Sequence, residues 1–321
     1  MKKINIFGLT NSNGLADDIA NHLGLKLSAC SIQKFADGEM IAQGFNSVRG
    51  SHCYVVQPTS PPNVNESIME LLIMIDALKR ADAKSICAVI PYYGYARQDR
   101  KCKPRQPITS KLVATILEAA GATRVMVMDL HASQIQGFFN VQIDEFSALP
   151  IITKHFKEKN IEDMTIVSPD HGGAVRAKKM SELLKCPTAI IDKQRPRPNE
   201  SEVVGIIGKV KNRNCILIDD MIDTGGSIVN AVIELKKEGA KDVYVACTHP
   251  LFSDPAIERL SSCDAKEIVV TNTIHIDKEK RFDNLIILNT AELFADGINA
   301  VYEERSLGDV IQEFENKVLE K

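Results

Sequence analysis

Short runs of apolar, often β-branched residues alternate along the chain with longer segments in which apolar positions recur every three or four residues. The first pattern is typical of buried strands and the second of amphipathic helices. Their regular alternation predicts an α/β fold, with a mainly parallel sheet covered by helices on both faces. The predicted strands are residues 4–8, 52–56, 85–90, 124–129, 165–168, 188–192, 214–219, 242–248 and 267–271. The predicted helices are residues 65–80, 110–120, 173–184 and 226–238.

Five of the predicted strands end in polar or glycine-rich turns. The turns are PYYGYARQDR from residue 91, DLHAS from 129, SPDHGG from 168, DKQRPRP from 192 and DDMIDTGGS from 219. Ligands of open parallel sheets bind just beyond the carboxyl ends of the strands. We therefore expect a composite site assembled from several of these turns.

The length of the chain, 321 residues, suits two α/β domains of ordinary size. Residues 137–150 form the least periodic segment near the middle and are the expected boundary. We predict a first domain of residues 1–146 and a second of residues 147–305. The C-terminal tail, residues 306–321, is expected to join the first domain.

Hydrophobic residues make up 44% of the chain and charged residues 25%, a balance typical of globular proteins. No stretch approaches the roughly 20 consecutive apolar residues of a membrane span. The two lysines after Met1 resemble the start of a signal peptide, but the apolar run that follows them ends at Leu9. We expect a soluble protein that does not bind membranes.

Eight cysteines are scattered singly, without a CxxC pair or the Cys/His spacing of a zinc site. Cys87, Cys215 and Cys247 lie within or beside predicted strands, where cysteine serves as a small buried hydrophobe. This usage favours a reducing cytoplasm over a disulfide framework. The net charge of -3 gives no reason to expect nucleic acid as a partner, so any anion-binding site must be local.

The segment that follows the predicted strand 214–219 combines carboxylates, hydroxyls and glycines. It reads Asp219, Asp220, Met221, Ile222, Asp223, Thr224, Gly225, Gly226 and Ser227, and an amphipathic helix follows. The glycines let backbone N–H groups at a helix N-terminus approach a phosphate, and the hydroxyls add donors. The adjacent carboxylates suit sugar hydroxyls or Mg²⁺. The pattern predicts a ribose-phosphate site, and an ordinary acidic turn is the structural alternative.

This loop resembles the phosphoribosyl pyrophosphate loop that type I phosphoribosyltransferases share with ribose-phosphate pyrophosphokinases. Five further segments are FADGE (35–39), PYYGYARQDRK (91–101), DLHASQIQGFFNVQID (129–144), VSPDHGG (167–173) and AIIDKQR (189–195). Together the six segments resemble class I ribose-phosphate pyrophosphokinases nearly from end to end. The resemblance implies two phosphoribosyltransferase-like domains, each a mainly parallel sheet flanked by helices.

The FADGE segment places an aromatic ring beside two carboxylates, a set suited to stacking on a purine and accepting from its exocyclic amine. In isolation it would be a common surface turn. The resemblance implies that Phe35, Asp37 and Glu39 line the adenine site and are supplied by a neighbouring subunit.

Five basic residues and a single carboxylate lie between Arg97 and Arg105, directly after the strand-end motif PYYGY. Most charge runs are solvated surface, but a polyphosphate in the strand-end crevice would meet this one. The resemblance implies that Arg97, Gln98 and Asp99 contact ATP.

His131 follows Asp129 directly after a predicted strand, so both side chains can reach the strand-end crevice. A single histidine is more often structural. The resemblance makes His131 and Asp170 ligands of the Mg²⁺ carried on ATP. Because histidine is an uncommon Mg²⁺ ligand, contact between His131 and the γ-phosphate is an equal alternative. His171 stands where the family often has a small residue, which affects the shape of the nucleotide pocket.

Lys193, Arg195 and Arg197 form a basic cluster after the predicted strand 188–192. A basic surface loop is the structural alternative. The resemblance makes Lys193 and Arg195 the catalytic cations that stabilise charge on the transferred phosphoryl groups. Such cations contribute roughly 10³ to 10⁵ in rate.

The resemblance implies transfer of the pyrophosphoryl group of ATP to the 1-hydroxyl of ribose 5-phosphate, with Mg²⁺ as cofactor, in cytoplasmic nucleotide biosynthesis. It also implies a homo-oligomer, a hexamer built from dimers, and an allosteric phosphate site at Ser47 and Arg49. Two alternatives stay open. They are a type I phosphoribosyltransferase and a catalytically silent regulatory subunit of the synthetase.

Overall fold

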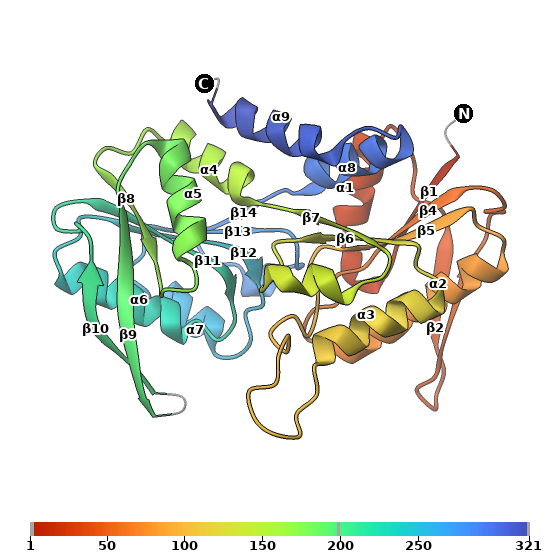
Figure 1. Ribbon diagram of the computed structural model, residues 1–321, viewed down its shortest axis with the longest axis horizontal. Helices are drawn as coiled ribbons and strands as arrows, with labels where there is room; N and C mark the ends of the chain where they lie inside the picture. Colours follow the sequence, from red (N-terminus) through yellow and green to blue (C-terminus); the bar gives the residue numbers. More distant parts are fainter. Residues whose placement is uncertain (1–2, 198–199, 320–321) are drawn as a thin grey trace. The chain divides into compact units, whose positions relative to one another are not determined.

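The computed structural model describes residues 3–197 and 200–319, and it describes side chains except at residues 193–204 and 318–319. Contacts divide the chain into two compact units. The first unit comprises Met1–Ser147, Thr273–His275 and Thr290–Ile311, and the second comprises Ala148–Asn272, Ile276–Asn289 and Gln312–Lys321. Each unit is a mainly parallel sheet flanked by helices, which confirms the predicted fold class (Figure 1).

The first unit is built on a five-stranded parallel sheet in the order β1-β4-β5-β6-β7. Its strands are β1 Ile4–Gly8, β4 His52–Val56, β5 Ser85–Ile90, β6 Arg124–Met128 and β7 Gln142–Phe146. Its helices are α1 Leu15–His22, α2 Val64–Arg80, α3 Thr109–Ala120 and α8 Ala291–Tyr302, with short 3-10 helices η1 Thr10–Ser12 and η2 Ser133–Phe138. Helices α2 and α3 cover one face of the sheet, and α1 and α8 cover the other (Figure 1).

A separate antiparallel hairpin of β2 (Cys30–Lys34) and β3 (Met40–Gly44) packs on α2 through β3. The apolar stripe of α2 explains how the core forms. Leu71, Met74, Ile75 and Leu78 recur at three- and four-residue spacing, and all four are buried. A helix with this period presents one apolar face to the sheet, and burying each such side chain contributes about 1.5 to 3 kcal/mol.

The second unit is built on a seven-stranded sheet in the order β10-β9-β8-β11-β12-β13-β14, in which only the pairing of β10 with β9 is antiparallel among the described strands. Its strands are β8 Met164–Ser168, β9 Thr188–Arg197, β10 Glu200–Ile207, β11 Asn214–Ile222, β12 Val243–Pro250, β13 Glu267–Thr271 and β14 Leu285–Leu288. Its helices are α4 Leu149–Glu158, α5 Ala174–Leu184, α6 Gly226–Lys237 and α7 Ala256–Ser261, with a 3-10 helix η3 Lys278–Lys280. Helices α4 and α5 cover one face, and α6 and α7 cover the other (Figure 1).

All the predicted strands and helices are present, and most of their ends agree within two residues. Two strands are longer than predicted. β11 continues to Ile222 because Met221 and Ile222 are buried and pair with β12. β9 continues to Arg197 because β10 pairs with it, and the segment 137–150, expected to be an irregular boundary, contains β7.

The observed units differ from the predicted domains beyond residue 272. Residues 290–305, expected in the second domain, belong to the first unit, because α8 packs on α1 and Phe294 packs edge to face on Phe146 at 5.5 Å between ring centres. The last helix, α9 (Leu307–Leu319), begins in the first unit, but its residues from 312 onward group with the second. There Glu315 pairs with Lys179 of α5 at 2.7 Å.

All eight cysteines are free, and Cys87, Cys215 and Cys247 are buried as predicted. In the part of the chain that the structure describes, none of the helices has the length and apolar character needed to cross a membrane.

Gly297 of α8 lies so close to Phe146 that a methyl group does not fit. A Cβ at this position would lie 2.7 Å from Cε1 of the Phe146 ring, which is itself fully buried against Phe294. We expect Gly297→Ala to destabilise the protein by about 1 to 3 kcal/mol, despite the better helix propensity of alanine. Gly308→Ala in α9, where a Cβ makes only an ordinary contact, is the matched control. Urea unfolding of both variants measures the difference, and equal midpoints would contradict the crowding argument.

Candidate functional site

The second unit has a topological switch point at the carboxyl ends of β8 and β11, which are neighbours at the centre of its sheet. From β8 the chain passes through α5 to β9 on one side, and from β11 it passes through α6 to β12 on the other. The connections therefore diverge at this point and leave a crevice above the two strand ends, where ligands of open α/β sheets bind.

The predicted ribose-phosphate loop lies on β11 and the start of α6. Asp219 and Asp220 are inside the strand, and the loop proper runs from Asp223 to Gly225. Gly225 has φ of +74°, a left-handed conformation that favours glycine, and α6 begins at the next residue. The chain thus presents the first N–H groups of a twelve-residue helix at the switch point, as an anion site requires.

The side chains of the loop differ in burial from its strand end to its helix end. Asp219 is half-buried, Asp220 is buried, and Asp223 is half-buried. Gly226 is half-buried, while the hydroxyl residues Thr224 and Ser227 are exposed. The carboxylates of Asp219 and Asp220 are therefore less accessible than the hydroxyls of Thr224 and Ser227.

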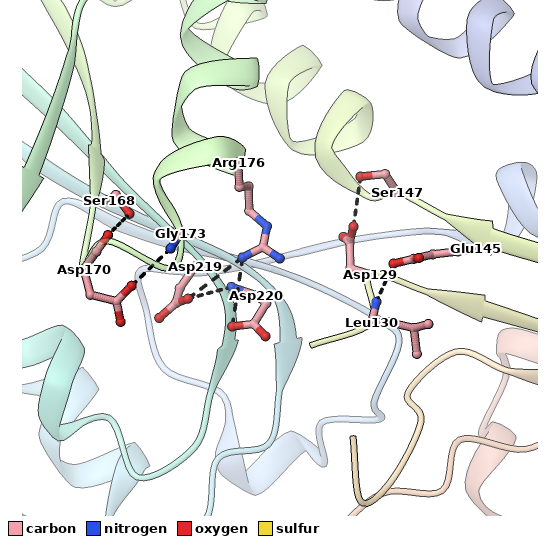
Figure 2. A network of polar contacts seen from close by, with 10 residues as sticks. All are labelled: Asp129, Leu130, Glu145, Ser147, Ser168, Asp170, Gly173, Arg176, Asp219 and Asp220. Carbon is pink, nitrogen blue, oxygen red and sulfur yellow. Dashed lines mark hydrogen bonds and ion pairs between the residues drawn. The ribbon is translucent and has the colours of Figure 1, made fainter. Parts of the chain in front are cut away.

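Asp219 and Asp220 share one guanidinium group. Nη1 of Arg176, on α5, lies 4.0 Å from Oδ1 of Asp219 and 4.0 Å from Oδ1 of Asp220 (Figure 2). The N–H of Asp220 also donates to Oδ1 of Asp219 at 2.9 Å. Burial and the charge of Asp220 together raise the pKa of Asp219 to about 8, and Arg176 opposes that rise. The pair therefore holds one proton at neutral pH, and a bound cation would favour the release of that proton.

Sequence reasoning missed Arg176, which follows the SPDHGG turn on α5. The sequence predicted that the adjacent carboxylates suit sugar hydroxyls or Mg²⁺, and it did not indicate an arginine beside them. The signal was available in part, because a residue near the start of the helix after β8 must lie beside the end of β11 once the two strands pair.

The raised pKa of Asp219 makes the stability of the protein depend on pH. An unfolded aspartate titrates near 3.9, so between about pH 4 and pH 8 the folded pair holds a proton that the unfolded chain has lost. Stability therefore falls as pH rises through this window. We expect Asp219→Asn in a chelating buffer to become more stable than the parent protein, by roughly 1 to 3 kcal/mol, as pH rises from 5 to 9. Thermal midpoints across this range, with Asp17→Asn as an exposed control, check the trend, and a constant difference would refute it.

The turn after β8 is fixed by local hydrogen bonds. Oγ of Ser168 donates to the carbonyl oxygen of Asp170 at 2.6 Å, and the N–H of Gly173 donates to Oδ1 of Asp170 at 3.1 Å (Figure 2). Asp170 is exposed, so this contact orients its carboxylate at the start of α5. Nε2 of His171 lies 3.1 Å from Oδ1 of Asp192, and this contact links the turn to β9.

Lys193 and Arg195 lie on β9, beyond the three residues that pair with β8. Lys193 is opposite Val203 of β10, and the register shifts between Val203 and Gly205. Both predicted catalytic side chains lie outside the described residues. Both residues lie in the C-terminal part of β9. Because β9 is parallel to β8, this part lies at the same edge of the sheet as the loop that follows β8.

The predicted ATP residues of the first unit also follow neighbouring parallel strands, β5 and β6. Arg97 and Gln98 are exposed, and Asp99 is half-buried. Oε1 of Gln98 accepts from Oγ1 of Thr109 at 2.6 Å, which ties this turn to the start of α3. Gln134, on η2, donates to Oδ2 of Asp99 at 2.7 Å. Sequence reasoning missed Gln134, which connects the turn after β5 to the turn after β6.

The turn after β6 has a strained start. Asp129 has φ of +39°, and its Oδ1 accepts from Oγ of Ser147 at 2.9 Å (Figure 2). The N–H of Leu130 donates to Oε1 of Glu145 at 2.8 Å. These contacts hold the backbone that presents His131, which is exposed. A non-glycine residue with positive φ that is kept in place by two side chains is typical of functional sites.

The FADGE segment is the tight turn of the β2–β3 hairpin. The N–H of Phe35 donates to the carbonyl oxygen of Glu39 at 2.8 Å, and the N–H of Glu39 donates to Oδ1 of Asp37 at 3.0 Å. Phe35, Asp37 and Glu39 are all exposed, with 44% of Phe35 accessible. The turn therefore presents an aromatic ring and two carboxylates outward.

Ser47 and Arg49, the predicted allosteric residues, are exposed. Nε of Arg49 lies 3.8 Å from Oδ2 of Asp82. An anion that binds Arg49 must compete with this carboxylate.

No group of three or more His, Cys, Asp or Glu side chains among the described residues is arranged to hold a metal ion. The donor chemistry still fits Mg²⁺, which prefers oxygen ligands and commonly binds through one or two carboxylates plus phosphates and water. Asp219 and Asp220 offer such oxygens on neighbouring residues of β11.

Comparisons with known proteins agree over most of the chain. The model of the N-terminal domain of ribose phosphate pyrophosphokinase matches residues 4–121, and that of the phosphoribosyl transferase domain matches residues 148–282. Ribose-phosphate pyrophosphokinases of Bacillus cereus and Corynebacterium ammoniagenes are each 54% identical over 304 residues, covering 95% of this chain and 96% of theirs. The crystal structure of phosphoribosylpyrophosphate synthetase from Mycobacterium smegmatis has a TM-score of 0.89 and 44% identity, covering 94% of this chain and 100% of that one. The chain belongs to the ribose-phosphate pyrophosphokinase family.

Proposed function

We propose that the chain is a ribose-phosphate diphosphokinase, which transfers the pyrophosphoryl group of ATP to the 1-hydroxyl of ribose 5-phosphate and releases AMP. The observation that carries the proposal is the loop from Asp219 to Ser227. It combines a carboxylate pair in a strand with the exposed N-terminus of a helix at a switch point. A ribose 5-phosphate has matching ends, with hydroxyls at one and a dianion at the other.

In the proposed reaction the 1-hydroxyl oxygen attacks the β-phosphorus of ATP in line. The bond between this oxygen and the β-phosphorus forms, the bond from the β-phosphorus to the oxygen that bridges it to the α-phosphorus breaks, and AMP leaves with that oxygen. The proton of the 1-hydroxyl passes to solvent. Asp219 and Asp220 orient the ribose hydroxyls, residues 224–227 hold the 5-phosphate, and Asp223 belongs to the same ribose 5-phosphate loop. Positioning and electrostatics supply most of the catalysis in such transfers, so a strong general base is not required.

ATP is proposed to bind between two groups of residues. Phe35, Asp37 and Glu39 hold the adenine, and Arg97, Gln98 and Asp99 contact the nucleotide from the turn after β5. Lys193 and Arg195 then hold the triphosphate and act on the transferred group, and His131 contacts either the γ-phosphate or the Mg²⁺ carried on ATP. These assignments follow from the family resemblance at each position. The exposed FADGE turn is compatible with them.

Mg²⁺ is the proposed cofactor. His131 and Asp170 would hold the ion carried on ATP, and Asp219 with Asp220 would hold a second beside the ribose hydroxyls. A bound Mg²⁺ supplies neutralisation of phosphate charge.

One experiment separates this function from its rivals. The purified protein is mixed with Mg-ATP and ribose 5-phosphate, and products are identified by phosphorus NMR. AMP and a sugar pyrophosphorylated at C1 support the proposal, and ADP would indicate an ordinary kinase. No turnover would favour a silent regulatory subunit. A separate assay that supplies phosphoribosyl pyrophosphate and a base tests for a phosphoribosyltransferase.

A homo-oligomer built from dimers, a hexamer by resemblance, is proposed as the active form. Large apolar side chains are exposed on the β2–β3 hairpin and on the helix that packs against it. They are Phe35, Ile41, Phe45 and Met69. Exposed apolar groups that gather on neighbouring elements are typical of interaction surfaces.

Regulation through a phosphate at Ser47 and Arg49 is also proposed. The hydroxyl and the guanidinium suit an anion, and the ion pair of Arg49 with Asp82 must open for it. Inhibition by ADP that remains purely competitive with ATP would remove this proposal.

A further inference from the structure

Helix α7 packs directly against the ribose-phosphate loop, and its role is not explained by the residues discussed so far. A Cβ on Gly225 would lie 3.4 Å from Cγ of Leu260 and 3.6 Å from the backbone of Ala256. Leu260 and Ala256 are fully buried. The glycine therefore serves two purposes, the left-handed turn and the close approach of α7.

Arg259, on the same helix, places its guanidinium beside the loop backbone. Nη1 of Arg259 donates to the carbonyl oxygen of Thr224 at 3.0 Å. The same atom would lie 3.3 Å from a Cβ on Gly226, the first residue of α6. Arg259 is exposed, and no carboxylate in the described part of the chain forms an ion pair with it. Its charge is therefore available to an anion at the loop.

This position matters because the loop presents backbone N–H groups at one end and carbonyls at the other. A carbonyl oxygen repels a nearby dianion unless it accepts a hydrogen bond. Arg259 donates a hydrogen bond to the carbonyl oxygen of Thr224 and so fixes the orientation of the peptide that precedes Gly225. It also adds a full positive charge where the helix N-terminus supplies only partial charge.

We propose that Arg259 is a positioning residue for the 5-phosphate, acting through the Thr224 carbonyl and through its charge. The inference rests on the proposed assignment of this loop to ribose 5-phosphate. Its consequence is selective. The residue contributes to binding of the sugar phosphate and leaves the nucleotide and the chemical step unaffected, because uniform binding changes KM without changing kcat.

We expect Arg259→Ala to raise the KM for ribose 5-phosphate by about tenfold to thirtyfold, while kcat and the KM for ATP stay within about threefold. Arg259→Lys keeps the charge but not the planar donor, and is expected to recover part of the loss. Arg281→Ala is the matched control. Arg281 also donates to a backbone carbonyl of the second unit, that of Ile276 at 3.3 and 3.4 Å, but is not on the loop.

Calorimetric titration with ribose 5-phosphate in the absence of ATP keeps this test separate from the proposed activity. If the parent protein forms no phosphoribosyl pyrophosphate but binds ribose 5-phosphate in an Arg259-dependent manner, the activity fails and the role of Arg259 stands. If the parent protein is active and Arg259→Ala binds ribose 5-phosphate as tightly as the parent does, the role of Arg259 is refuted. Equal losses for ATP and ribose 5-phosphate in Arg259→Ala and Arg259→Lys, with a lowered thermal midpoint, would also refute it by indicating a purely structural residue.

Discussion

Lys193→Ala is expected to lower kcat about a thousandfold while leaving the affinity for ATP within a few fold. The reason is that the ammonium group would neutralise charge that develops mainly as the β-phosphorus is transferred, so its contribution is made in the transition state. A thousandfold loss corresponds to about 4 kcal/mol of transition-state stabilisation. Steady-state kinetics with direct measurement of nucleotide binding checks both parts.

Two comparisons sharpen this test. Lys193→Arg should recover little activity, since a planar guanidinium does not replace a compact ammonium. Lys209→Ala, an exposed lysine after the β9–β10 hairpin, should be neutral. If Lys193→Ala remains folded with near-parental turnover, the residue is a solubilising surface lysine and the mechanistic assignment is wrong. The ribose-phosphate loop assignment would survive that result.

The strands and helices that were predicted follow from the period of their apolar residues, whereas α1, α4, α8 and α9 were not predicted. Residues 215–218 read as a continuous apolar run before two aspartates, and every residue of β11 except the half-buried Asp219 is buried. What periodicity did not predict was its continuation to Ile222, since a pair of acidic residues inside a strand looks like its end. The cross-strand pairing of Met221 and Ile222 with β12 keeps the strand intact.

The distant contacts of the chain were not predictable in the same way. Residues 290–305 return to the first unit because Phe294 and Gly297 pack on Phe146, and a sequence contains no local signal for such a pairing. Short elements were missed for a related reason. The β2–β3 hairpin exposes much of its surface, so its residues lack a strong apolar alternation.

The residues of the candidate site also fall into a predictable group and a group that was not predictable. Residues within one motif, such as Asp219 to Ser227, were identified together because their spacing contains the chemistry. Residues that support the motif from another element were missed, and Arg176, Gln134 and Arg259 are the examples. Each contacts a predicted residue through one side-chain group, and only the pairing of strands and the packing of helices bring it there.

The exposed apolar side chains Phe35, Ile41, Phe45 and Met69 form a surface on and beside the β2–β3 hairpin. Disrupting this surface is expected to abolish most activity without unfolding the chain. Ile41 and Phe45 of this surface are 48% and 58% exposed, so a charged replacement costs the isolated chain little. In an oligomer the same replacements would bury two carboxylates in an apolar contact, which is strongly unfavourable. If the FADGE turn completes the adenine site of a neighbouring subunit, the double variant Ile41→Glu, Phe45→Glu should be monomeric and lose at least a hundredfold in kcat/KM for ATP.

The control for this variant is Ile233→Glu on α6, which replaces an exposed apolar residue of the second unit. It should keep both the assembly and the activity of the parent protein. Light scattering at the assay concentration reports the mass, and thermal unfolding reports whether the chain is intact. Full activity in a verified monomer would show that each chain binds adenine by itself, and the proposed role of Phe35 across a subunit boundary would then be wrong.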